Sequence, residues 1–274
     1  CFFGPVVGPA VTVALMAALG WKAVFWLFGV IGVLLGVLWF KFVPDNPKQS
    51  PYVNEAELEH INDGRENTVE AKEIAPWGKL LKSSQFWSLG LQFMITDYIM
   101  YVFLAWLPLY LMEVHGFSLS KMGLWAAAPW LSLMAVVSCC GYLSDKAIAA
   151  GFSQNLVKTS TGAVGILLCA CTLFIATRTA DPMMNVFWLS VALGSLGLTM
   201  SASWSSVISM GGRFAGSVSG WMNFWGNIGG VLAPSVTAWV ATTYGWQAAL
   251  AVTAVSGIAG AVLWLFVKPD KAIV

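Results

Sequence analysis

Long apolar runs separated by short polar breaks dominate the pattern of hydrophobic and polar positions along this chain. The clearest run covers residues 86–111 and contains one charged side chain, Asp97, near its middle. A helix of about 20 apolar residues crosses the hydrocarbon core of a bilayer, so this run predicts a membrane span. The same pattern predicts spans at residues 3–20, 23–42, 86–111, 122–143, 158–177, 184–209, 214–241 and 247–267.

Two local signals punctuate these runs. The apolar stretch 214–267 is too long for one helix, and a turn is expected at residues 242–246, which include Gly245. Within the long polar segment, Asn54 followed three residues later by Glu57 predicts a capped helix over residues 55–62, closed by Gly64. We interpret this short helix as a solvated face that lies under the membrane.

Composition agrees with a membrane protein. The chain is 58% hydrophobic and 10% charged, with a mean hydropathy of +0.75, whereas soluble domains are about 25% charged. The fold class is therefore all-α integral membrane. No basic stripe, glycine-rich phosphate loop, metal-ligand pattern or nucleophile–base pair is present, so we expect no nucleic-acid partner, no metal, no cofactor and no enzyme activity.

The basic residues predict the orientation of the spans. Alternate loops share a side when the helices cross in turn, and one side then holds 11 of the 14 Lys and Arg residues. This side includes the loop 44–84 and the C-terminus. We therefore expect a multi-pass protein of the cell membrane, plasma or inner, with both of these segments in the cytoplasm.

The two ends of the chain are related by an internal repeat. A shift of 225 residues aligns positions 4–45 with 229–270 without a gap and gives 15 identities. Shared proline, Gly-Trp and Pro-Asp positions make chance similarity a poor explanation. Both copies are two helices that end at the same face, so the repeat is parallel, as in secondary transporters built from two six-helix halves.

This repeat predicts the domain organisation. The second copy follows four spans, but nothing precedes the first copy, and the chain begins with Cys1 inside an apolar run. We expect about four further helices, or about 140 residues, upstream, so that this fragment holds the last eight of twelve spans. Residues 1–43 would end the first bundle, 44–84 would join the bundles, and 85–274 would form the second.

Several sequence motifs occur along the chain, at residues 28–40, 44–51, 53–61, 106–111, 115–118, 141–146, 212–216, 221–223 and 226–230. In this order and spacing they resemble the major facilitator superfamily, and within it the anion:cation symporters, which take up sugar acids and other organic anions with protons. The most specific motif lies where the second span enters the polar loop, and similar runs with Asn-Glu-Ala-Glu-Leu occur there in hexuronate, galactonate and glucarate carriers. The resemblance covers the whole chain and implies the major facilitator fold.

One position departs from the pattern of the family. The symporters often have Asn where this chain has Asp97, and a second anion in the pocket would repel an anionic substrate unless the carboxyl were protonated or paired. Helical spacing places Asp97 and Tyr101 near one stripe, with Tyr98 beside them. Burial favours a neutral acid, which could bind and release a proton. The alternatives are a structural pair with a cation or neighbouring helix, and a position on a watery edge.

Further candidates for the cavity lie on the later spans. Serines of the span 184–209 are small residues that suit close helix packing, but the resemblance implies that Ser201 and Trp204 contact substrate. Asn223 and Asn227 lie one turn apart, and a buried amide there could bond the hydroxyls of a sugar acid. The family places a substrate-binding amide at the position of Asn223.

Three charged residues, Asp145, Lys146 and Arg213, lie on the expected cytoplasmic loops. Two interpretations remain open. The three residues form a latch that holds one conformation, or they are ordinary positive-inside anchors. The second interpretation does not account for Asp145, because the positive-inside rule concerns Lys and Arg.

The residues and the resemblance together predict a secondary active transporter that acts as a monomer in the lipid bilayer. It would take up a small organic anion, a sugar acid, with protons by alternating access, and the proton gradient would supply the coupling ion. The alternatives are an exporter or exchanger of the same fold and a non-transporting membrane sensor or scaffold.

Overall fold

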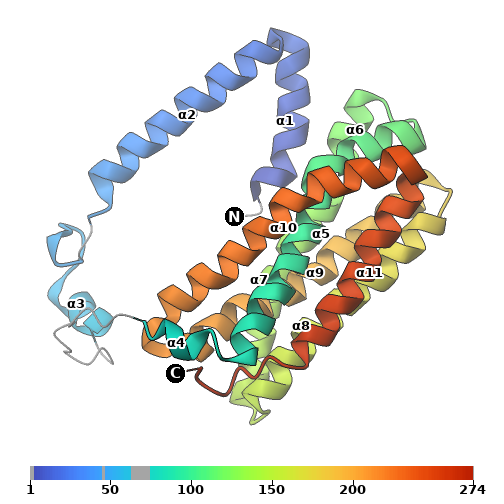
Figure 1. Cartoon of the computed structure of the whole chain (residues 1–274). Helices are drawn as coiled ribbons and strands as arrows, with labels where there is room; N and C mark the ends of the chain where they lie inside the picture. Colours follow the sequence, from blue (N-terminus) through green and yellow to red (C-terminus); the bar gives the residue numbers. More distant parts are fainter. Residues whose placement is uncertain (1–2, 45–46, 63–74, 274) are drawn as a thin grey trace. The chain divides into compact units, whose positions relative to one another are not determined.

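The computed structural model describes residues 3–44, 47–62 and 75–273, and the regular structure within these ranges is helical (Figure 1). In chain order the elements are α1 (Phe3–Leu19), α2 (Trp21–Phe42), η1 (Pro47–Gln49), α3 (Glu55–Asn62), α4 (Trp77–Leu80), α5 (Ser84–His115), α6 (Leu119–Trp125), α7 (Ala127–Ala149), α8 (Gln154–Arg178), α9 (Pro182–Gly211), η2 (Gly212–Phe214), α10 (Ala215–Tyr244) and α11 (Trp246–Trp264).

The all-α membrane fold predicted from the apolar runs is confirmed. Six helical runs among the described residues are long and apolar enough to cross a membrane, and one of them, Pro182–Tyr244, contains both α9 and α10. The helix α1 is apolar but shorter, with 17 residues. That these helices are the last eight of twelve membrane spans stays a prediction.

The chain divides into two units, Cys1–Val11 with Ala75–Val274 and Thr12–Ile74. The boundaries predicted at 43/44 and 84/85 stay a prediction, because this division does not test the six-helix bundles. In the smaller unit, Asn54 Oδ1 accepts a hydrogen bond from the Glu57 amide at 2.8 Å, so the predicted cap of α3 is confirmed. The predicted stop at Gly64 lies outside the described residues.

The repeat has a local counterpart in two helix junctions. Gly20 separates α1 from α2 with φ 80° and ψ 162°, and Gly245 separates α10 from α11 with φ 88° and ψ 165°. Each amide donates to the carbonyl four residues earlier, of Met16 or Ala241, at 3.0 Å. A positive φ suits glycine, so the shared Gly-Trp pair marks the same turn in both copies.

Within the larger unit, α9 packs against α7 and α8, and α5 packs against α10 and α11. Small residues allow these helices to approach closely, as is usual in membrane bundles. At Gly165 of α8, an added Cβ would lie 2.8 Å from the Ser195 carbonyl oxygen of α9. The core of the unit lies between the helices and includes the fully buried Leu89, Leu133 and Leu193.

Among these contacts, the close packing of α5 against α10, called the α5–α10 seam below, matters most for function. An added Cβ at Gly226 would lie 2.8 Å from a Phe93 ring carbon, and one at Gly230 would lie 3.0 Å from the Tyr101 ring. At Gly229 the neighbours are the backbone atoms of Met94 and Tyr98. The glycines therefore bring the polar faces of α5 and α10 to one place.

Candidate functional site

A large cavity opens among α5, α7, α9 and α10 of the larger unit. Its volume is about 670 Å³, which lies within the range of about 300–1,000 Å³ typical of small-molecule pockets. Its polar lining side chains are Asp97, Tyr101, Ser201, Trp204, Ser205, Asn223 and Asn227, and its apolar lining comes from Phe93, Met100, Val137, Met200 and Ile208.

Asp97, in the middle of α5, is the one charged residue in this lining. The residue is 6% exposed, so it does not lie on a watery edge. Its Oδ1 has no hydrogen-bond partner, and within the described part of the chain no cation pairs with its carboxyl group. Gly226 leaves room beside Oδ2, because an added Cβ there would collide with this oxygen.

Hydroxyl and aromatic groups flank the carboxyl. Tyr101 lies one turn after Asp97 on α5, and Ser201 and Trp204 enter the cavity from α9. The indole of Trp204 meets the Phe93 ring edge to face at 5.9 Å, and Trp204 is 41% exposed. Among the described residues its N–H has no acceptor, so this donor is open to a ligand in the cavity.

The two amides on α10 differ in their bonding. Asn227 Nδ2 donates to the Asn223 backbone carbonyl at 2.8 Å, so part of its donor capacity is used within its own helix. No described contact occupies the side chain of Asn223, which is exposed to the cavity. Asn223 is therefore the more available amide for a ligand.

The structure brings six of the seven predicted cavity residues together, and their roles stay predictions. The exception is Tyr98, which is half-buried and does not line the cavity. The Tyr98 backbone belongs to the α5–α10 seam, since its amide nitrogen lies 3.1 Å from an added Cβ at Gly229.

Several polar residues behind the cavity wall were not expected from the sequence. Gln92 is fully buried on α5 and its Nε2 donates to Ser203 Oγ of α9 at 3.1 Å. Lys158 of α8 is also buried, and its ammonium donates to the Ser205 carbonyl at 3.0 Å and to Ser209 Oγ at 3.2 Å. These bonds fix the part of α9 that carries the cavity lining.

The charged residues of the predicted loop latch lie outside the cavity. Asp145 and Lys146 are exposed near the end of α7, and Arg213 is exposed in η2. Asp145 interacts electrostatically with Lys158, and the Arg213 guanidinium lies 5.0 Å from the centre of the Phe214 ring. Both interpretations, latch and anchor, therefore stay open.

The described residues contain no group of three His, Cys, Asp or Glu side chains that could hold a metal ion. The absence of a cofactor stays a prediction. The polar groups of the cavity are donors and acceptors without an activated nucleophile among them, and such a lining suits binding and release of a polar molecule.

Comparisons with known proteins agree with this arrangement. The chain is 27% identical over 271 residues to an ascorbate transporter of Arabidopsis chloroplasts, covering 98% of this chain and 50% of that protein. It is 28% identical over 263 residues to a D-galactonate transporter of Escherichia coli O6:H1, covering 92% and 60%. The chain thus spans about half the length of the curated relatives it matches.

A solved structure shares the fold. A bacterial homologue of the human lysosomal transporter Spinster, in an inward-facing and unoccupied conformation, superimposes with a TM-score of 0.61. The match covers 96% of this chain and 64% of the other, at 18% identity. The names of the relatives point to a transporter rather than an enzyme. The model of the Major Facilitator Superfamily matches residues 2–234, and the chain therefore belongs to this family.

Proposed function

We propose that the protein is a secondary active transporter that takes up a small organic anion, a sugar acid, together with protons. The observation that carries this proposal is the cavity in which Asp97, Trp204 and Asn223 converge from three helices. A carrier needs such a polar site inside the membrane, and relatives named as ascorbate and D-galactonate transporters support an oxygen-rich anion as its cargo.

The lining suits the polyhydroxyl part of such a molecule. Amide, hydroxyl and indole groups can donate to and accept from neighbouring hydroxyls of one substrate. The lining contains no cation but contains the carboxyl of Asp97. An anion enters this cavity more readily when Asp97 is protonated, because two negative charges in a site of low dielectric repel each other strongly. This requirement links substrate binding to proton binding.

In this proposal the protein acts as a monomer in the cell membrane, with the loop 44–84 and the C-terminus in the cytoplasm. The excess of Lys and Arg on that side supports the orientation. Transport follows from rocking of two helical bundles about the site, so that the cavity opens to each side in turn. The proton gradient supplies the driving force.

Uptake into liposomes tests the function. The complete product of the gene is reconstituted, a pH gradient is imposed with the outside acidic, and labelled galactonate or glucarate is added outside. Accumulation above the outside concentration, abolished by a protonophore, supports the symporter. Accumulation only against a preloaded anion supports the exchanger, and export under the reversed gradient supports the exporter. No movement and no stabilisation by any sugar acid would support a sensor or scaffold.

Asn223→Ala is expected to raise the KM for the sugar acid by about tenfold, since a lost hydrogen bond in a desolvated site leaves a polar substrate group unpaired. Expression and thermal stability should stay unchanged, because no described contact depends on this side chain. Concentration-dependent uptake measures the effect. Asn155→Ala, on α8 outside the cavity lining, is the matched control. An unchanged KM for Asn223→Ala would remove Asn223 from the site.

A further inference from the structure

Among the described residues, two pairs of buried side chains join α5 to α9 by hydrogen bonds. Gln92 Nε2 of α5 donates to Ser203 Oγ of α9 at 3.1 Å. Asn185 Nδ2 of α9 donates to the Tyr110 hydroxyl of α5 at 3.0 Å. Gln92, Ser203 and Asn185 are fully buried, and Tyr110 is nearly so. The two helices are therefore linked at two separate levels of the membrane.

The spacing of the two bonds is the same on both helices. From Gln92 to Tyr110 on α5 is 18 residues, and from Asn185 to Ser203 on α9 is also 18 residues. At 3.6 residues per turn this spacing makes about five turns, or about 27 Å along the axis. Both bonds therefore lie on one face of each helix, and their reversed order means that α5 and α9 run antiparallel.

The Gln92–Ser203 bond lies directly behind the wall of the substrate cavity. The residue that follows each partner, Phe93 on α5 and Trp204 on α9, lines the cavity, whereas Gln92 and Ser203 do not. The rings of Phe93 and Trp204 meet edge to face at 5.9 Å. The bond and the ring contact therefore hold the same level of the two helices, one from inside the bundle and one from the cavity.

Further hydrogen bonds fix the orientation of this buried pair. Gln92 Nε2 also donates to the Leu89 carbonyl at 3.2 Å. Thr96 Oγ1 donates to the Gln92 backbone carbonyl at 2.9 Å and lies 3.4 Å from its Oε1. Ser203 Oγ donates in turn to the Thr199 carbonyl at 2.8 Å. A buried polar pair that is satisfied in this way favours one arrangement of its helices over others.

Apolar packing places α5 and α9 in different groups of helices. α9 packs mainly against α7 and α8, whereas α5 packs mainly against α10 and α11. α9 is also tied to α8, because Thr199 Oγ1 donates to the Gly162 carbonyl at 2.8 Å. Polar side chains join helices across a membrane bundle where packing alone does not set their register. The position of α9 against α5 therefore depends strongly on the two polar pairs.

We propose that Gln92 and Ser203 are positioning residues for the substrate cavity. Their hydrogen bond sets the position of Trp204 relative to Asp97, so that one substrate molecule reaches both the indole N–H and the carboxyl group. The bond of Tyr110 holds the same two helices about 27 Å away and does not act on the site. This inference rests on the proposed function, since it assigns the pair a role in binding the same cargo.

Uptake of labelled galactonate or glucarate by the complete protein in liposomes tests the proposal. Gln92→Leu and Ser203→Ala should each raise the KM about fivefold with little change in Vmax, because the binding groups are present but misplaced. The double variant should also raise the KM about fivefold rather than about 25-fold, because both changes remove the same bond. Ser203→Ala removes a single oxygen atom, so it keeps the test open if Gln92→Leu does not fold.

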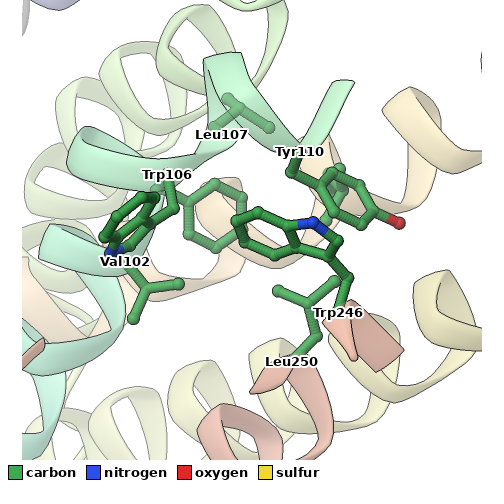
Figure 2. A pocket seen from close by; sticks show the side chains of 8 residues that line it. Val102, Trp106, Leu107, Tyr110, Trp246 and Leu250 are labelled. Carbon is green, nitrogen blue, oxygen red and sulfur yellow. The ribbon is translucent and has the colours of Figure 1, made fainter. Parts of the chain in front are cut away.

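Tyr110→Phe is the matched control. Figure 2 shows the Tyr110 ring among apolar side chains with its hydroxyl pointing away from them, so this change removes the hydrogen bond and keeps the packing of the ring. Tyr110 lies nine residues beyond Tyr101, the last cavity residue on α5. The KM should therefore stay unchanged although the Tm falls. An equal rise in KM would show that loosening the helix pair at any level weakens binding, and would overturn the assignment to Gln92 and Ser203.

Hydrogen–deuterium exchange of the purified protein measures the positioning without any substrate. Gln92→Leu should speed amide exchange about fivefold at residues 199–208 of α9, and Tyr110→Phe should do so at residues 182–190 instead. If the wild type takes up no sugar acid, the proposed function fails, and the exchange rates still decide the positioning role. Unchanged exchange at residues 199–208, or an unchanged KM in both single variants of an active protein, would overturn the proposal.

Discussion

Asp97→Asn is expected to abolish proton-driven accumulation of substrate while the protein still folds and still exchanges substrate across the membrane. A pH difference of one unit supplies about 1.4 kcal/mol for each coupled proton, which supports about a tenfold accumulation at zero membrane potential. An amide cannot bind or release that proton. The accumulation ratio of the variant should therefore fall from about ten to about one under the same gradient.

The structural reason lies in the surroundings of the carboxyl group. Asp97 is buried, its Oδ1 lacks a partner, and no described cation is paired with it. An ionised carboxylate left in this state carries a large desolvation penalty, and the penalty falls when the group is protonated. The sign follows from this argument: an acidic outside favours the neutral acid and anion binding, and a less acidic inside favours proton release.

Two comparisons make the result decisive. Asp270→Asn removes an exposed carboxylate near the C-terminus and should leave accumulation unchanged. Counterflow of labelled against unlabelled substrate, without a pH gradient, should persist in Asp97→Asn because it requires no net proton movement. If accumulation and its pH dependence both survive in Asp97→Asn, this residue does not lie in the coupling path.

Local signals in the sequence predict much of the fold, because they depend on neighbouring residues. The apolar runs predict the helices, and the Asn54 cap and the Gly20 and Gly245 turns need only their own segment. The stripe on α5 predicts that Asp97 and Tyr101 share a face. Asn223 and Asn227 likewise share a face because they are four residues apart.

Contacts between helices are harder to predict. A helix that is apolar on all sides does not indicate which side meets protein and which meets lipid. The sequence therefore could not exclude Tyr98 from the cavity, nor pair Gln92 with Ser203 across α5 and α9. In the sequence Lys158 is only a basic residue at the start of the predicted span 158–177, but in the structure its ammonium donates to the Ser205 carbonyl behind the cavity.

Gly229→Ala is expected to lower the stability of the folded protein by disturbing the packing of α5 against α10, and it removes no substrate-binding group. An added Cβ would collide with the Met94 carbonyl oxygen and would lie 3.0 Å from the Met94 carbonyl carbon. Both atoms belong to the backbone of α5, so no side chain can move aside. Overpacking of this kind costs about 3 kcal/mol, which corresponds to a fall in Tm of about 6–12 °C.

The matched control is Gly220→Ala on the same helix, where an added Cβ meets no atom within 4 Å. This control should be neutral or slightly stabilising, since Ala favours a helix more than Gly does. Thermal unfolding of both variants in the same detergent measures the difference. Because α5 carries Asp97 and α10 carries Asn223, separation of the two helices should also weaken substrate binding. Equal Tm values for the two variants would show that α5 and α10 do not depend on this close approach, and the placement of both cavity walls would then need another cause.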